Sequence, residues 1–166
     1  MKMANLESLF HDGLCDIYYA EKKILKALPK MISAAQSPDL QAAFQQHLEE
    51  TEEQVERLQQ VFELMGESAK GKTCPAIDGI LEEGEEVMAS YDGSPALDAG
   101  LVAAAQAVEH YEIARYGTLC AWAAVLGMDD AEDLLQQTLL EETATDEVLS
   151  DLAETSINSA AVQQAA

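Results

Sequence analysis

The sequence predicts an all-α fold, a four-helix bundle with a long crossover that contains a short extra helix. Two observations support this prediction. The string LEET occurs at Leu48–Thr51 and again at Leu140–Thr143, displaced by 92 residues. Ahead of each copy lies another pair of similar strings, Tyr19–Glu21 and His110–Glu112, displaced by 91. The chain therefore consists of two similar helix pairs related by a pseudo-twofold axis, and the repeated acidic residues are expected to meet near that axis.

The bulk composition indicates one acidic domain. A chain of 166 residues, 48% of them apolar, is long enough for a single core, so we expect one domain over residues 1–166. The 31 Asp and Glu outnumber the 9 Lys and Arg and give a net charge of -22. Such a charge repels phosphate backbones and anionic membrane surfaces. Nucleic acid and membrane are therefore unlikely partners by electrostatics, and cations are the favoured small ligands.

The cysteines favour a reducing compartment. Cys15, Cys74 and Cys120 are odd in number and contain no CxxC spacing, so neither a disulfide framework nor a thiolate metal site is indicated. The N-terminus lacks the apolar core of a signal peptide, and no apolar run is long enough to span a membrane. We expect a cytoplasmic protein.

The first helix pair begins with an N-cap signal. Asn5 is expected to cap a helix that ends near Ala35, with Glu21 in the middle of its apolar stripe. Pro29 is expected to kink this helix or to shorten its hydrogen bonding. Ser37-Pro38 is a strong start signal for the second helix.

The second helix is expected to end at Gly66, and it brings Glu50 and Gln54 onto or beside its buried face. A crossover of about residues 66–94 follows, with a short helix from Cys74 to Tyr91 whose acidic outer side we interpret as solvated. Short loops join antiparallel neighbours, whereas this long crossover allows the second and third long helices to run parallel.

The second helix pair begins at Ser94-Pro95, and Gly127 is expected to end its first member. Glu109 and Glu112 lie beside or within the apolar stripe of that helix. The last long helix starts at Asp129, and two acidic residues interrupt its apolar face, Glu142 and Asp146. The Ala- and Gln-rich tail of about residues 159–166 is expected to fray.

A carboxylate in the apolar stripe of every long helix requires compensation, because an isolated buried charge costs several kcal/mol. Metal ions compensate several carboxylates at once, as in bundle proteins with two metal ions. The pairs Glu50 with Gln54 and Glu142 with Asp146 have the i, i+4 spacing that places both side chains on one face. The alternative is that some of these residues sit at stripe edges and reach solvent.

Other polar residues near these stripes have two interpretations. His47 and His110 are either hydrogen-bonded boundary residues or metal ligands. Four tyrosines are either core aromatics or hydrogen-bond donors to the carboxylates. They are Tyr18, Tyr19, Tyr111 and Tyr116.

Four segments resemble the YciF-type ferritin-like stress proteins. They are DIYYAEKKILKALPKM, HLEETEEQVERL, AAAQAVEHYEIARYGTL and LEETATDEVLSDLA, and they span nearly the whole chain. Because rubrerythrins and ferritins are relatives of that family, the resemblance implies a ferritin-like four-helix bundle with a di-iron-type centre. The implied ligands are Glu21, Glu50, Glu109, Glu112 and Glu142, with Gln54 and Asp146 where the wider superfamily tends to have His. This departure predicts weaker iron binding, another divalent ion or slow reaction with oxidants.

The leading hypothesis is a rubrerythrin-like oxidoreductase or peroxidase of the stress response that binds two divalent ions, iron first, with manganese or zinc as alternatives. Glu50 and Glu142 would bridge the ions, Glu21 and Glu112 would be terminal ligands, and Glu109 an adjustable one. No catalytic residue besides the ligands is expected, and a homo-oligomer is expected, with a dimer favoured over a larger assembly. The alternative is a structural or interaction bundle with an idle metal site.

Overall fold

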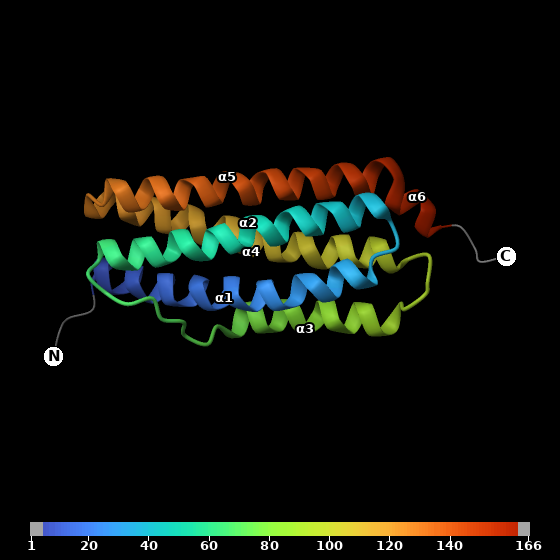
Figure 1. Cartoon of the computed structure of the whole chain (residues 1–166), viewed down its shortest axis with the longest axis horizontal. Coiled ribbons are helices and arrows are strands. Elements are labelled where there is room, and N and C mark those ends of the chain that lie inside the picture. The colour runs from blue at the N-terminus through green and yellow to red at the C-terminus, as the bar shows by residue number, and fades with distance from the viewer. Residues whose placement is uncertain (1–4, 163–166) are drawn as a thin grey trace.

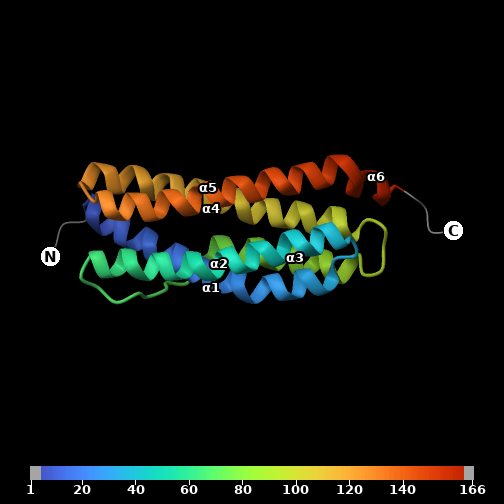
Figure 2. The same ribbon diagram turned by 45° about the horizontal axis from the view of Figure 1, so that its top comes forward.

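The structure is a computed structural model, and it describes residues 5–162. Four long helices form the bundle, α1 (Leu6–Ala34), α2 (Pro38–Leu64), α4 (Leu97–Leu126) and α5 (Asp129–Leu152). The crossover contains the shorter α3 (Pro75–Ser90). Figures 1 and 2 show the four long helices side by side along one axis, with α3 on the outside. The predicted four-helix bundle with a helix in its crossover is confirmed.

The helix ends follow from local signals in the sequence. The side chain of Asn5 accepts a hydrogen bond from the Ser8 amide, and that of Ser37 accepts one from the Leu40 amide, so both predicted N-caps are confirmed. α1 continues through Pro29. At the C-terminal end of α4, Gly127 adopts φ 70°. The amides of Gly127 and Met128 then donate hydrogen bonds to carbonyl groups of the last helical turn.

Some boundaries differ from the prediction. α2 ends at Leu64, two residues before Gly66, and α4 begins at Leu97 because the residues from Ser94 first form a turn. The chain also stays helical beyond α5, through a π-helical turn η1 (Ala153–Ile157) and the short α6 (Asn158–Ala161). Residues 159–161, which belong to the tail predicted to fray, are helical, and residues 163–166 of that tail lie outside the described residues.

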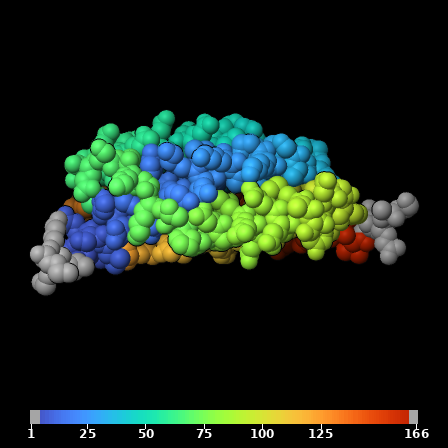
Figure 3. Space-filling view, turned by 90° about the horizontal axis from the view of Figure 1, so that it is seen from below, coloured from blue at the N-terminus to red at the C-terminus, as the bar shows by residue number. Residues whose placement is uncertain are grey.

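The helix directions are fixed by contacts between distant segments. His47 of α2 meets Glu109 of α4, whereas Arg57 of α2 meets Thr138 of α5. Together with the short connections, these contacts make α2 antiparallel to α1 and α5 and parallel to α4. The crossover packs as a fifth helix, since α3 lies along α1 and α4 and covers part of their surface (Figure 3). This is the arrangement expected of a bundle with one long crossover.

The core is formed by apolar side chains of the packed helices and extends toward both ends of the bundle. Its largest fully buried side chains include Phe10, Phe44 and Phe62. At one end Asp98, which is buried near the start of α4, accepts hydrogen bonds from the amides of Gln36 and Ser37. This carboxylate satisfies the backbone of the α1–α2 loop and ties it to the second helix pair. No helix among the described residues is long and apolar enough to cross a membrane.

Candidate metal centre

Halfway along the bundle the apolar core is interrupted by polar side chains from all four long helices. All of them are buried: Glu21 from α1, His47 and Gln54 from α2, Glu109 and Glu112 from α4, and Glu142 from α5. These positions continue the apolar stripe of each helix, so the packing that buries the neighbouring Leu, Phe and Val also buries these groups. We call this set the polar cluster.

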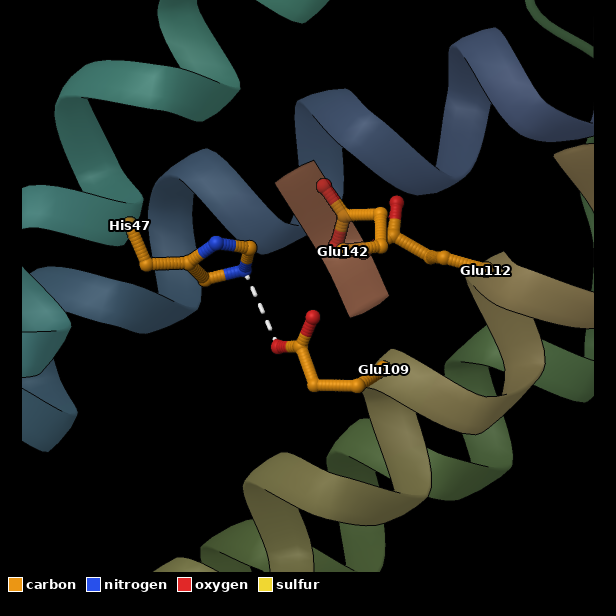
Figure 4. Close-up of side chains that lie close together, drawn as sticks. All are labelled: His47, Glu109, Glu112 and Glu142. Atoms are coloured by element: carbon orange, nitrogen blue, oxygen red, sulfur yellow. Dashed lines mark ion pairs between the residues drawn. The ribbon is translucent and has the colours of Figure 1, made fainter. Parts of the chain in front are cut away.

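Four members of the polar cluster have the geometry of a metal site. His47, Glu109, Glu112 and Glu142 each offer one ligand atom, and these atoms lie within 4.8 Å of one another. Figure 4 shows the four side chains converging from three helices. The Nε2 atom of His47 lies 3.1 Å from an Oε1 of Glu109. Imidazole nitrogen with carboxylate oxygens is a donor set that suits iron, manganese or zinc.

Many side-chain polar atoms of the polar cluster have no hydrogen-bond partner. Buried side-chain oxygens and nitrogens normally have a hydrogen-bond partner. Within residues 5–162, every buried side-chain N or O atom without a properly directed partner belongs to this cluster. The atoms are Glu21 Oε2, His47 Nδ1 and Nε2, Gln54 Oε1, Glu109 Oε2, both carboxylate oxygens of Glu112, and Glu142 Oε2. A cation bound by several of these atoms would provide the partner that they lack.

Burial and mutual repulsion shift the ionisation of the polar cluster. The pKa of Glu21 is raised from 4.5 to about 8, first by burial and then by the charge of Glu142, although a hydrogen bond from Tyr116 opposes the shift. Burial and the charge of Glu142 also raise the pKa values of Glu109 and Glu112 well above the ordinary value. Without a cation, the cluster therefore holds protons that a bound metal ion would displace.

One of the four tyrosines serves the polar cluster. The hydroxyl of Tyr116, fully buried in α4, donates a hydrogen bond to Oε1 of Glu21. Burial raises the pKa of Tyr116 well above 10, so this hydroxyl keeps its proton. The other three have partners elsewhere: Tyr18 accepts from Gln59, Tyr19 donates to Asp78, and Tyr111 meets the Cys74 thiol.

Two predicted ligands lie at the rim of the polar cluster. Glu50 is half-buried, and its Oε1 accepts a hydrogen bond from Gln46. It lines a small cavity of about 60 Å³ between α2 and α5, which His47 also lines. Asp146 is half-buried and binds the side chains of Gln106 and His110 instead. Because His110 is exposed, it belongs to the surface of α4.

The stripe of α2 explains why His47 is inside and Glu50 is not. Buried positions on this helix recur as Phe44, His47, Thr51, Gln54 and Leu58, which follows the helical period. Glu50 falls one position ahead of this series, at its edge. The apolar periodicity of α2 therefore indicates that His47 is buried, whereas the repeated LEET string points to Glu50.

Comparison with known proteins gives the chain a family. Residues 5–162 match the family model described as a domain of unknown function, DUF892. The chain belongs to this family. Among characterised sequences, Protein YciF of Escherichia coli (strain K12) is 45% identical over 166 residues, which is 99% of this chain and 100% of YciF. The predicted resemblance to YciF-type stress proteins is confirmed.

Solved structures of similar proteins show the same fold. The E. coli stress protein YciF has a TM-score of 0.89 and 46% identity, covering 94% of this chain and 99% of its own. A Rhodopseudomonas palustris protein described as YcfI, a putative structural protein, has a TM-score of 0.87 and 51% identity, with 90% and 95% covered. A Xanthomonas campestris protein has a TM-score of 0.72 and 25% identity, covering 93% of this chain and 94% of its own.

Proposed function

We propose that this protein binds two divalent metal ions, iron first among them, in the polar cluster, and that the loaded centre reacts with oxygen or peroxide during stress. The observation behind the proposal is the concentration of unpartnered buried oxygens and nitrogens at the centre of a four-helix bundle. A protein that kept these groups buried with no ligand would lose several kcal/mol of stability. Metal binding offsets this loss, and the similarity to a stress protein supports a stress role.

The ligands we assign come from all four long helices. Glu112 and Glu142 lie at the centre of the cluster and are the candidates to be shared between two ions. His47 and Glu109 approach from one end, and Glu21 from the other. Gln54 is assigned as an amide ligand, while Glu50 and Asp146 remain predicted ligands at the rim. Manganese or zinc could occupy the same oxygen-rich donors.

Bound iron would supply one-electron redox chemistry and a Lewis acid for an oxidant. The protein's part is to exclude water and to hold the ligands. Tyr116 fixes one oxygen of Glu21 by hydrogen bonding. Glu109 pairs with His47 through Oε1, and its Oε2 has no hydrogen-bond partner, so this carboxylate has an oxygen available for a change in its mode of binding.

We also propose a cytoplasmic location and a homodimer. All three cysteines are free and buried, which suits a reducing compartment. We propose a small molecule, oxygen or peroxide, as the oxidant. The sequence contains no CxxC pair of the kind that a rubredoxin-type electron-transfer site uses, so we propose a separate protein as the electron donor.

The test is a metal analysis followed by a rate measurement. Metal-free protein is titrated with Fe²⁺ without oxygen, and two ions per chain are expected. The loaded protein is then mixed with hydrogen peroxide, and iron oxidation is followed by near-ultraviolet absorbance. The redox role is supported if bound iron is oxidised faster than free Fe²⁺. It also predicts that Glu109→Ala slows this oxidation by more than its weaker iron binding explains. Equal rates for bound and free iron would leave only metal binding.

A structural or interaction bundle is the second candidate. The similar protein from R. palustris is described as a putative structural protein, and two positions of the site hold Gln54 and Asp146 instead of the His that the resemblance leads us to expect. This function predicts no stoichiometric iron, manganese or zinc in the purified protein and no gain of stability on adding them.

A further inference from the structure

A buried arginine lies beside the polar cluster. Among the described residues, Arg57 on α2 is the one Lys or Arg that is buried. Its guanidinium binds Glu141 as a fork, with Nη1 2.8 Å from Oε2 and Nη2 2.6 Å from Oε1. Nη1 also donates to the Thr138 hydroxyl at 2.9 Å. Two parallel charge-assisted bonds fix Glu141 in direction as well as in place.

Gln54 connects this ion pair to the polar cluster. Its amide nitrogen donates to Oε2 of Glu141 at 3.1 Å and also to Oε1 of Glu142. Both partners are carboxylates, which accept hydrogen bonds when ionised, so the amide must turn its NH₂ group toward them. The amide oxygen is then forced to the opposite side. It is buried there without a partner.

The amide oxygen of Gln54 belongs to a different end of the cluster from His47. The two residues are seven apart on α2, which separates their Cα atoms by about 10 Å along the helix. On the parallel α4, Glu109 and Tyr116 are also seven apart. Since His47 meets Glu109 and Tyr116 meets Glu21, Gln54 lies at the level of Tyr116 and Glu21.

We propose that Arg57 and Glu141 are positioning residues that hold the Gln54 amide oxygen as a ligand for a second, weaker cation at the Glu21 end. This inference rests on the proposed metal binding. The His47 end offers an imidazole and carboxylates. The Glu21 end offers a neutral amide oxygen and has a guanidinium nearby, and each of these lowers its attraction for a cation. The two positions should therefore fill in order, the His47 end first.

The test is a titration of the metal-free full-length protein with Co²⁺, followed by calorimetry and by the visible absorption of bound cobalt. The wild type should show two steps of unequal affinity. Gln54→Leu should lose the weaker step. Arg57→Lys keeps the charge but loses the fork, and should weaken that step by about tenfold or more, as loss of an outer partner of a ligand does. The stronger step should weaken less than the weaker one in both variants, even though Gln54 also donates to Glu142.

The matched control is Glu53→Gln. Glu53 contacts the same guanidinium, at 3.4 Å, but its side chain is 72% exposed. Both steps should match the wild type. Circular dichroism melts show which variants are folded, and Arg57→Lys provides the test if Gln54→Leu does not fold.

The outcomes separate the inference from the proposed function. Two wild-type steps that are unchanged in Arg57→Lys and Gln54→Leu would overturn the inference and leave metal binding in place. Equal weakening of both steps would also overturn it, because Arg57 and Gln54 would then not act specifically on the cation at the Glu21 end. Absence of stoichiometric cobalt in the wild type would contradict the proposed function itself.

Discussion

At the residue scale, the decisive feature is the difference between two glutamates that the sequence repeat makes equivalent. Glu142 is fully buried and bonded to Gln54, whereas Glu50 is half-buried and bonded to Gln46. A buried carboxylate with a free oxygen is a stronger ligand candidate than one that reaches solvent, because its desolvation has already occurred on folding.

The first prediction compares these two residues by metal titration. Glu142→Ala should abolish binding of at least one ion, since it removes a carboxylate from the centre of the cluster. Glu50→Ala should lower the affinity by less than about tenfold, the lower limit for a residue that supports a ligand. Loss of an ion in Glu50→Ala would instead support the assignment made from the repeat.

The second prediction concerns the hydroxyl of Tyr116. Tyr116→Phe leaves Glu21 buried without this donor and should destabilise the metal-free protein by about 1–3 kcal/mol where Glu21 is ionised. Because the pKa of Glu21 is about 8, the loss should be larger above that pH than near pH 6, where the carboxyl is neutral.

Denaturant unfolding of Tyr116→Phe at the two pH values measures this difference. Tyr19→Phe is the control, since its hydroxyl binds Asp78 away from the cluster, and its effect should be the same at both pH values. A pH-independent loss in Tyr116→Phe would show that the hydroxyl does not act on the Glu21 carboxylate.

At the element scale, α4 contributes Glu109 and Glu112 to the polar cluster, and it must end where the chain can turn and α5 can pack antiparallel to it. Gly127 provides that end, in the left-handed conformation that residues with a Cβ rarely adopt. Gly117 lies within the same helix, and a Cβ built there would meet nothing within 4 Å.

The third prediction uses these two glycines as a matched pair. Gly127→Ala should lower the free energy of unfolding by about 1 kcal/mol, because alanine is strained at φ 70°. Gly117→Ala should raise it by about 0.5–1 kcal/mol through the better helix propensity of alanine. Denaturant melts of both variants give the comparison. Destabilisation by Gly117→Ala would mean that α4 has no room at that turn.

At the scale of the whole molecule, the polar cluster makes folding depend on pH and metal. Glu21 has a pKa of about 8 in the folded protein and an ordinary value of 4.5, so between these values the folded state binds more protons than the unfolded state. Its contribution to stability is fully present below about pH 4.5 and is lost as pH rises to about 8. Glu109 and Glu112 shift in the same direction.

The fourth prediction is that the melting temperature of the metal-free protein falls as pH rises through this window. Excess Fe²⁺ or Zn²⁺ should reduce the fall, because a ligand that binds only the folded state stabilises it and competes with the protons. Glu21→Gln should flatten the metal-free curve. An unchanged slope in that variant would assign the pH dependence to Glu109 and Glu112 or to the general charge of -22 instead of to Glu21.

The sequence alone determined the architecture of this protein. Its signals are local and act within a few residues. They are the N-caps Asn5 and Ser37, the C-cap Gly127 and the helical spacing of apolar residues. The repeat of Glu21 with Glu112 indicated that carboxylates from different helices would meet, and both are buried in the polar cluster.

The tertiary structure decided which polar residues share the core. Periodicity placed His47 in the apolar stripe of α2 and Glu50 beside it, but it did not show which of these side chains would meet the carboxylates of other helices. Only the assembly of the bundle, in which α2 packs against α1 and α5, brought His47 to Glu109 of α4 and left Glu50 at the rim. The contacts of Arg57 and Gln54 with Glu141 join residues more than eighty positions apart, and no local pattern predicts them.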